Sequence, residues 1–164
     1  MNRCIVVAIA AALTPACPVA SAQVTEEGRT LAAAFSQADL NLLGECQARV
    51  EGGAALHAEF GAWLDAQGQK DALAAAVRQK EQAPPLAARL SQNRRRAAQA
   101  KGVKLADSEA AYARIKSGFA RKTGEDDAAA YTRWHQATIL PPGCSDANRR
   151  AIWKAEVDNL AEVE

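Results

Sequence analysis

The sequence has few aromatic residues and few large aliphatic side chains for its length. Aromatic residues make up 5% of its 164 residues, whereas 40 residues are alanine. Alanine strongly favours the helix but buries little surface, so a domain built from this sequence has a thin hydrophobic core. A small domain with a thin core gains from a covalent cross-link.

The chain also lacks the patterns of β-structure and of common enzymes. No segment alternates apolar and polar residues over the length of a strand, so little β-structure is expected. GxSxG, HExxH, a Walker-type glycine loop and the Glu-x-x-His pairs of di-iron bundles are all missing. CxxC and CxxCH are missing too. We therefore expect no cofactor, no metal site and no catalytic residue, which makes an enzyme the less favoured class.

The few candidates for catalysis have simpler interpretations. His57 and His135 have no partner residue at a spacing typical of catalysis, so we interpret both as helix-surface residues. Glu26-Glu27 and Asp126-Asp127 stand at expected helix starts. Acidic side chains there interact favourably with the helix dipole, which favours a structural role over sugar hydrolysis.

The first 22 residues have the three parts of a cleavable secretory signal peptide. Arg3 supplies a positive charge, residues 4–13 are apolar, and Ala20-Ser21-Ala22 is the small-residue pattern that precedes cleavage. The apolar run is about half of the ~20 residues that a membrane-spanning helix needs. We therefore expect residues 1–22 to be removed and residues 23–164 to form a single helical domain, periplasmic or secreted.

A second interpretation of the same segment places a lipid on Cys17. Residues 13–17 resemble a loose form of the bacterial lipoprotein signal, in which a cysteine after small residues is acylated. Thr14 and Pro15 depart from that motif. Under this alternative Cys17 would hold a membrane anchor and residues 18 to about 30 would be a tether; otherwise we expect no contact with a membrane.

Two cysteines, Cys46 and Cys144, lie outside this segment. In an oxidising compartment two remaining cysteines usually pair. The loop that they would close has roughly 100 residues, for which the chain-entropy model gives a stabilisation on the order of 4–5 kcal/mol. We therefore expect a Cys46–Cys144 disulfide, with two free buried thiols as the alternative.

Apolar residues recur at three- and four-residue steps through most of residues 23–164, which predicts amphipathic helices with short connections. We expect Gly52-Gly53 to end the first long helix, Gly68 to end the next, and Pro84-Pro85 to be a firm break before a helix over 86–101. We also expect the three tryptophans to face inward. The predicted fold is all-α: a small Ala-rich helical bundle of about five to seven helices with one disulfide.

Charge is balanced over residues 23–164 but unevenly distributed. Residues 23–77 carry three basic against eight acidic residues, residues 78–122 twelve against three, and residues 123–164 four against eight.

Arg94, Arg95 and Arg96 are the most unusual local feature. Three consecutive arginines cover most of a helix circumference, so at least one must approach the bundle or a partner. We interpret them as a candidate anion-binding site for phosphate or carboxylate groups. The alternative is a solvated face, or pairing with the acidic segments.

These observations favour an exported, non-enzymatic interaction protein of the bacterial envelope, of the inhibitor, immunity, adaptor or chaperone type, whose partner is another envelope protein. One alternative is a carrier of a small ligand or anion that uses the basic helix over 86–101. Another is a carboxylate-based enzyme acting on envelope polymers. Export and balanced charge argue against nucleic acid, and the aromatic residues do not interleave with the basic run.

Overall fold

The computed structural model describes residues 24–161, so the expected signal peptide and Cys17 lie outside the described residues. Its six helices are α1 (Glu26–Ala33), α2 (Gln37–Ala66), α3 (Lys70–Ala97), α4 (Leu105–Ser117), α5 (Asp127–Thr138) and α6 (Cys144–Ala161). The described residues contain no strand. The prediction of an all-α bundle of five to seven helices is confirmed. None of the described helices is long and apolar enough to span a membrane.

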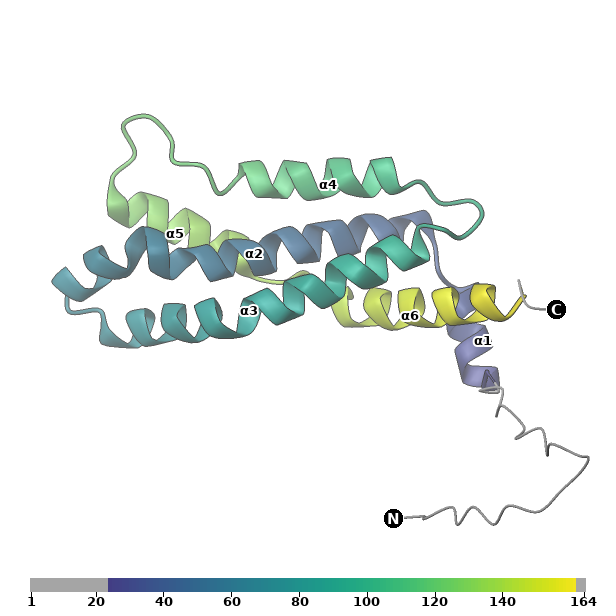
Figure 1. Ribbon diagram of the computed structural model, residues 1–164. Helices are drawn as coiled ribbons and strands as arrows, with labels where there is room; N and C mark the ends of the chain where they lie inside the picture. Colours follow the sequence, from purple (N-terminus) through teal and green to yellow (C-terminus); the bar gives the residue numbers. More distant parts are fainter. Residues whose placement is uncertain (1–23, 162–164) are drawn as a thin grey trace, which may run out of the picture.

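Helix α2 is the spine of the molecule (Figure 1). Helix α3 runs beside it over most of its length, whereas α4 and α5 follow one another along it. Helix α6 packs on both α2 and α3, and α1 packs on α6. The 30 residues of α2 span about 45 Å at the helical rise of 1.5 Å per residue, which makes the bundle elongated.

Two hydrophobic clusters follow one another along this spine. The first joins the early part of α2 to the later part of α3 and to α6; its buried residues include Leu40, Leu43, Cys46, Leu90, Cys144, Ala147 and Ala151. The second joins the later part of α2 to α5; its buried residues include Leu56, Phe60, Leu64, Phe119, Ala130 and Trp134. The ring centroid of Trp134 lies 5.3 Å from that of Phe60 and 5.5 Å from that of Phe119, both edge-to-face. Five of the eight aromatic residues lie in or against the second cluster: Phe60, Trp63, Phe119, Tyr131 and Trp134.

Gly52 and Gly53 lie inside α2, so the expectation that they end the first long helix is wrong. Gly52 is buried against Phe119, and a Cβ at Gly52 would overlap the phenyl ring. Glycine is needed there for close packing, and the helix continues because its packed sides outweigh a cost of about 0.5–1 kcal/mol for each glycine. The helix does end near Gly68, which has a φ of 67°.

Pro84 and Pro85 also lie inside a helix, so the expected break and the separate helix over 86–101 are wrong. Each proline removes a backbone N–H from the helical ladder. The ribbon of α3 bends between its two halves (Figure 1), as prolines inside a helix cause. Ala83 and Ala87, on either side of the pair, are buried in the first cluster. Packing against the spine therefore holds α3 together across the bend.

Cys46 of α2 and Cys144 at the start of α6 form a disulfide, as the sequence predicts, and their Cα atoms are 6.2 Å apart. Both residues are buried in the first cluster. The bond holds the beginning of α6, and with it the end of the preceding loop, against the spine. A buried structural disulfide is in keeping with an oxidising compartment.

Replacing Cys46 and Cys144 together with serine should lower the free energy of unfolding by about 2–5 kcal/mol, because the unfolded chain gains freedom. Urea denaturation of residues 23–164, compared with the double variant, measures this. Thiol titration of the unreduced, denatured protein should find no free thiol. Two free thiols in that titration would contradict the pairing.

The two adjacent glycines of α2 should respond to alanine in opposite directions. Gly52→Ala should destabilise the protein by about 1–3 kcal/mol, because the added methyl group overpacks against Phe119. At Gly53 a Cβ would lie 3.5 Å from the nearest atom of Gln79, an ordinary contact. Gly53→Ala should therefore stabilise by about 0.5–1 kcal/mol through helix propensity. Urea denaturation compares the two, and equal effects would contradict the packing role of Gly52.

Candidate functional site

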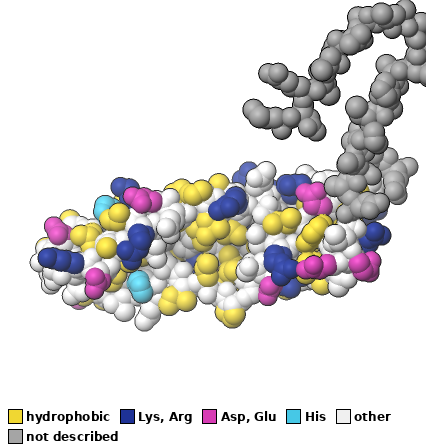
Figure 2. Space-filling view, turned by 90° about the horizontal axis from the view of Figure 1, so that it is seen from below, with side chains coloured by type: hydrophobic (Ala, Val, Ile, Leu, Met, Phe, Trp, Pro, Cys, Tyr) yellow, Lys and Arg dark blue, Asp and Glu magenta, His cyan; other side chains and the backbone are white. Residues whose placement is uncertain are grey.

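A recess of about 180 Å³ opens where the middle of α2, the bend of α3 and the loop between α5 and α6 meet. We call it the central recess; it is lined by Arg49, Val50, Gly53, Gln79, Gln82, Ala83, Leu86, Thr138 and Leu140. Leu86 and Leu140 are 37% and 43% exposed, and the neighbouring Ile139 is 62% exposed. Figure 2 shows hydrophobic side chains gathered near the middle of the molecule's length on the face seen from below.

Helix irregularities shape this recess. Gly53 contributes no side chain to its wall from α2, and Ala83 and Leu86 flank the proline pair on the opposite wall from α3. The residues that the sequence suggested as helix ends therefore lie across from each other at one site. The glycine pair and the proline pair mark the central recess in the structure, whereas in the sequence both predict helix ends.

Arg49 holds the loop wall of the central recess in place. Its Nη1 donates hydrogen bonds to the carbonyl oxygens of Ala137, at 2.7 Å, and Ile139, at 3.3 Å. These carbonyls end α5 and begin the loop, where an arginine side chain replaces missing helical donors. One turn earlier on the same face of α2, Cys46 holds the start of α6. One face of the spine therefore anchors both ends of the loop that carries Ile139 and Leu140.

The central recess also retains unused hydrogen-bonding capacity. Gln79 Oε1 and Arg49 Nε are buried and have no hydrogen-bond partner within the described part of the chain. A buried polar atom without a partner costs about 1–3 kcal/mol. Arg49 also carries a positive charge that no described acidic residue pairs with. The chemical character of the site is an apolar hollow with one cation at its wall.

The three consecutive arginines point in different directions. Arg94 is 2% exposed and donates hydrogen bonds to Glu109, at 2.9 Å, and Ser108, at 3.3 Å. The Ser108 hydroxyl in turn donates to the carbonyl oxygen of Leu40, at 2.6 Å. Arg94 therefore fastens α4 to α3 and α2, and this is the arginine that approaches the bundle. Sequence reasoning could not tell which of the three it would be.

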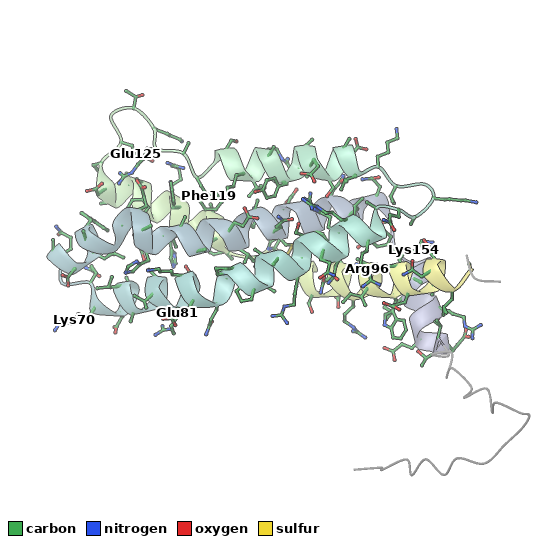
Figure 3. The ribbon with its side chains drawn as sticks, viewed as in Figure 1. Lys70, Glu81, Arg96, Phe119, Glu125 and Lys154 are labelled. Carbon is green, nitrogen blue, oxygen red and sulfur yellow. A yellow bond between two sulfur atoms is a disulfide. The ribbon has the colours of Figure 1, made fainter. Side chains whose placement is uncertain are left out.

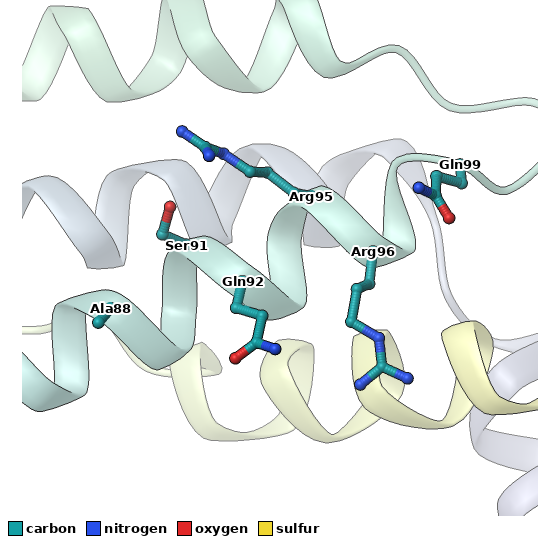
Figure 4. A pocket seen from close by; sticks show the side chains of 6 residues that line it. All are labelled: Ala88, Ser91, Gln92, Arg95, Arg96 and Gln99. Atoms are coloured by element: carbon teal, nitrogen blue, oxygen red, sulfur yellow. The ribbon is translucent and has the colours of Figure 1, made fainter.

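Arg96 pairs with Glu156 of α6 at 3.0 Å, whereas Arg95 is exposed. Both line a shallow groove of about 410 Å³ on the outer side of α3, together with Ala88, Ser91, Gln92 and Gln99. Figure 4 shows the guanidinium groups of Arg95 and Arg96 pointing away from each other. One anion cannot contact all three arginines, because one is buried and the other two diverge.

The polar cluster around Glu51 ties α2 to α4. Glu51 accepts hydrogen bonds from Gln47, Tyr112 and Lys116. Burial raises the pKa of Glu51, but these hydrogen bonds outweigh it and hold that pKa below its usual range. Burial and the bond to Glu51 raise the pKa of Tyr112 to about 12. A carboxylate with a lowered pKa and occupied oxygens is a poor general base, so we interpret the cluster as structural.

The tryptophans differ in burial. Trp134 is buried at the centre of the second cluster, whereas Trp63 packs against that cluster and is partly buried. Trp153 of α6 is also partly buried, and its ring lies against Gly28 of α1. All three face neighbouring helices, and none lines the central recess.

Replacing Arg49 with methionine should lower the free energy of unfolding by about 1–3 kcal/mol, because two carbonyl oxygens lose their donor. Amide hydrogen exchange should quicken at Ile139, Leu140 and Gly143, the residues of this loop that carry an amide hydrogen. Arg149→Met is the matched control, since Arg149 only pairs with Glu27 on the surface, where an ion pair contributes about 0–1 kcal/mol. Equal losses of stability in the two variants would contradict the anchoring role of Arg49.

The central recess can accept one apolar side chain, and Arg49 is the only residue of its lining that carries a charge.

Within residues 24–161 no group of three or more His, Cys, Asp or Glu residues could hold a metal ion. Comparisons of the chain with protein-family models, with curated proteins and with solved structures find no match.

Proposed function

We propose that the protein is an exported, non-enzymatic interaction protein of the bacterial envelope that binds a protein partner through the central recess. The observation that carries this proposal is the pair of exposed apolar side chains, Leu86 and Leu140, that line an apolar hollow, with the exposed Ile139 next to Leu140 in the chain. Single exposed apolar residues are ordinary on a protein surface. A group of them around a recess is typical of an interaction site.

The size of the central recess favours a protein partner over a small ligand. Its volume is about 180 Å³, whereas sites for small molecules commonly measure about 300–1,000 Å³. A hollow of this size has room for a single side chain. Protein interfaces commonly depend on a few apolar or aromatic side chains that fill such pockets.

The alternative functions have less support. A carrier that uses residues 86–101 would need its arginines free, but Arg94 is buried and bonded to Glu109. A carboxylate-based enzyme needs two carboxylates about 5–10 Å apart in a cleft. The central recess and the grooves beside α3 contain one carboxylate, that of Asp158, among the described residues. The envelope location rests on residues 1–22, and the disulfide is in keeping with it.

Partner capture tests the proposal. Residues 23–164 are used as bait in an envelope extract of the source organism, and captured proteins are quantified by mass spectrometry. The variant Leu86→Ser/Leu140→Ser should lose the enriched partner by about tenfold or more, which corresponds to about 1.4 kcal/mol or more of binding free energy.

The matched control is Ile152→Ser/Leu160→Ser, because these α6 residues are 38% and 39% exposed and lie outside the central recess. The control should keep the partner, and both variants should retain the wild-type urea midpoint. Equal loss in the two variants, or no enriched protein with the wild-type bait, would refute the proposal.

A further inference from the structure

Arginine and glutamine form a stripe along the outer face of α3. Successive members are four and three residues apart, which places them on one side of a helix. The members are Arg78, Gln82, Arg89, Gln92 and Arg96, with Pro85 between them and Gln99 in the turn that follows. All are exposed except Arg96, which is partly buried. From Arg78 to Arg96 this arginine–glutamine stripe spans about 27 Å at the helical rise.

The stripe borders the central recess and continues away from it. Gln82 lines the central recess itself. Gln92 and Arg96 line the shallow groove of Figure 4, where both side chains point toward α6. Arg96 also lines a second groove, of about 390 Å³, with Lys101 and Lys154. Figure 3 shows Arg96 and Lys154 on the same end of the molecule, where α3 and α6 run side by side. The stripe thus runs from the apolar hollow to these grooves, and in the second groove Lys154 pairs with Asp158 at 2.9 Å.

Two of the three arginines of this stripe are not neutralised as the cations of α4 are; the third, Arg96, pairs with Glu156 of α6 at 3.0 Å. On α4, Arg114 and Lys116 pair with Glu45 and Glu51 of α2. Arg78 and Arg89 have no acidic partner among the described residues. Among the described residues, the ion pairs between α2 and α4 and the pair of Arg96 with Glu156 leave Arg78 and Arg89 unpaired. A positive face therefore remains beside the apolar hollow.

We propose that the occupant of the central recess is an acidic protein segment, which inserts one apolar side chain into the recess and lays its carboxylates along the arginine–glutamine stripe. This inference rests on the proposed function. Arginine presents a planar fork of N–H donors that matches a carboxylate, and glutamine adds amide donors and acceptors that match a peptide backbone.

A protein segment fits better than another polyanion. An anionic lipid surface or a phosphate polymer would use the positive charge of Arg78 and Arg89 but would leave the central recess unfilled. A peptide supplies both groups at once, because its apolar and acidic side chains stand a few ångströms apart on one backbone. Its binding should weaken as salt rises, since exposed charges are screened.

Peptide selection tests the inference. A phage-displayed library of random linear peptides is selected on residues 23–164, and an enriched peptide is synthesised for anisotropy measurements. Enriched sequences should carry an apolar residue flanked by Asp or Glu. Arg78→Gln/Arg89→Gln should weaken the peptide by about tenfold or more at low salt, without changing stability, because arginine and glutamine have similar helix propensities.

Lys104→Gln/Lys122→Gln is the matched control, because it removes the same charge from the loops on either side of α4. The control should leave peptide affinity within about twofold, less than about 0.4 kcal/mol. Enriched peptides that are neutral or basic would overturn the inference, and so would equal effects of the two variants. Vesicles that contain phosphatidylglycerol are tested in parallel. If the protein binds these vesicles through Arg78 and Arg89 and the library yields no acidic peptide, the inference of an acidic segment is overturned in favour of a membrane surface.

The two proposals fail separately. Peptides that depend on Leu86 and Leu140 but not on Arg78 and Arg89 would overturn the acidic segment and leave the proposed function standing. Peptides that depend on neither pair would overturn both. Acidic peptides that lose affinity in both double variants support both.

Discussion

The disulfide between Cys46 and Cys144 fixes the region where α2 and α3 meet α6 and the loop that precedes it. A core built largely from alanine gives little resistance to sliding between helices, because each alanine buries little surface. The covalent bond removes that freedom at the start of α6. One turn further along α2, Arg49 restricts the end of α5 in the same way, by donating a hydrogen bond to the carbonyl oxygen of Ala137. The shape of the central recess depends on both anchors, since they hold the loop that forms one of its walls.

Ion pairs between helices add to the packing of the thin hydrophobic core. The acidic residues of α2 face the basic residues of α4, and the buried guanidinium of Arg94 joins α3 to the same helix. These pairs hold α4 in place together with Ile115, which packs against the second cluster. Arg78 and Arg89, on the outer face of α3, take no part in this pairing. Their position beside Leu86 is why an acidic segment with an apolar anchor is the partner that the surface fits best.

The candidate site could be located from the sequence only in part. Residues 139–143, Ile-Leu-Pro-Pro-Gly, indicate a connection, because two prolines and a glycine stand together directly before Cys144. The other two walls of the site were hidden, because Gly53 and Pro84-Pro85 look like the ends of helices when neighbours are not considered. The arginine cluster attracted attention as a binding site, yet Arg94 serves the fold. The direction of each arginine depends on which helix packs against α3, and a single helix does not carry that information.

Local signals were enough for the all-α class, the Cys46–Cys144 pairing and the helix end near Gly68. The first follows from composition and apolar periodicity, the second from the count of two remaining cysteines, and the third from the backbone preference of glycine; none of them depends on which helices pack together. The path of α2 through Gly52 and of α3 through Pro84-Pro85 was decided by tertiary structure. A glycine costs a helix about 1 kcal/mol and an interior proline about 3 kcal/mol, and burial against Phe119 and the first cluster exceeds those costs. Local propensity is weaker than packing wherever a helix is covered on several sides.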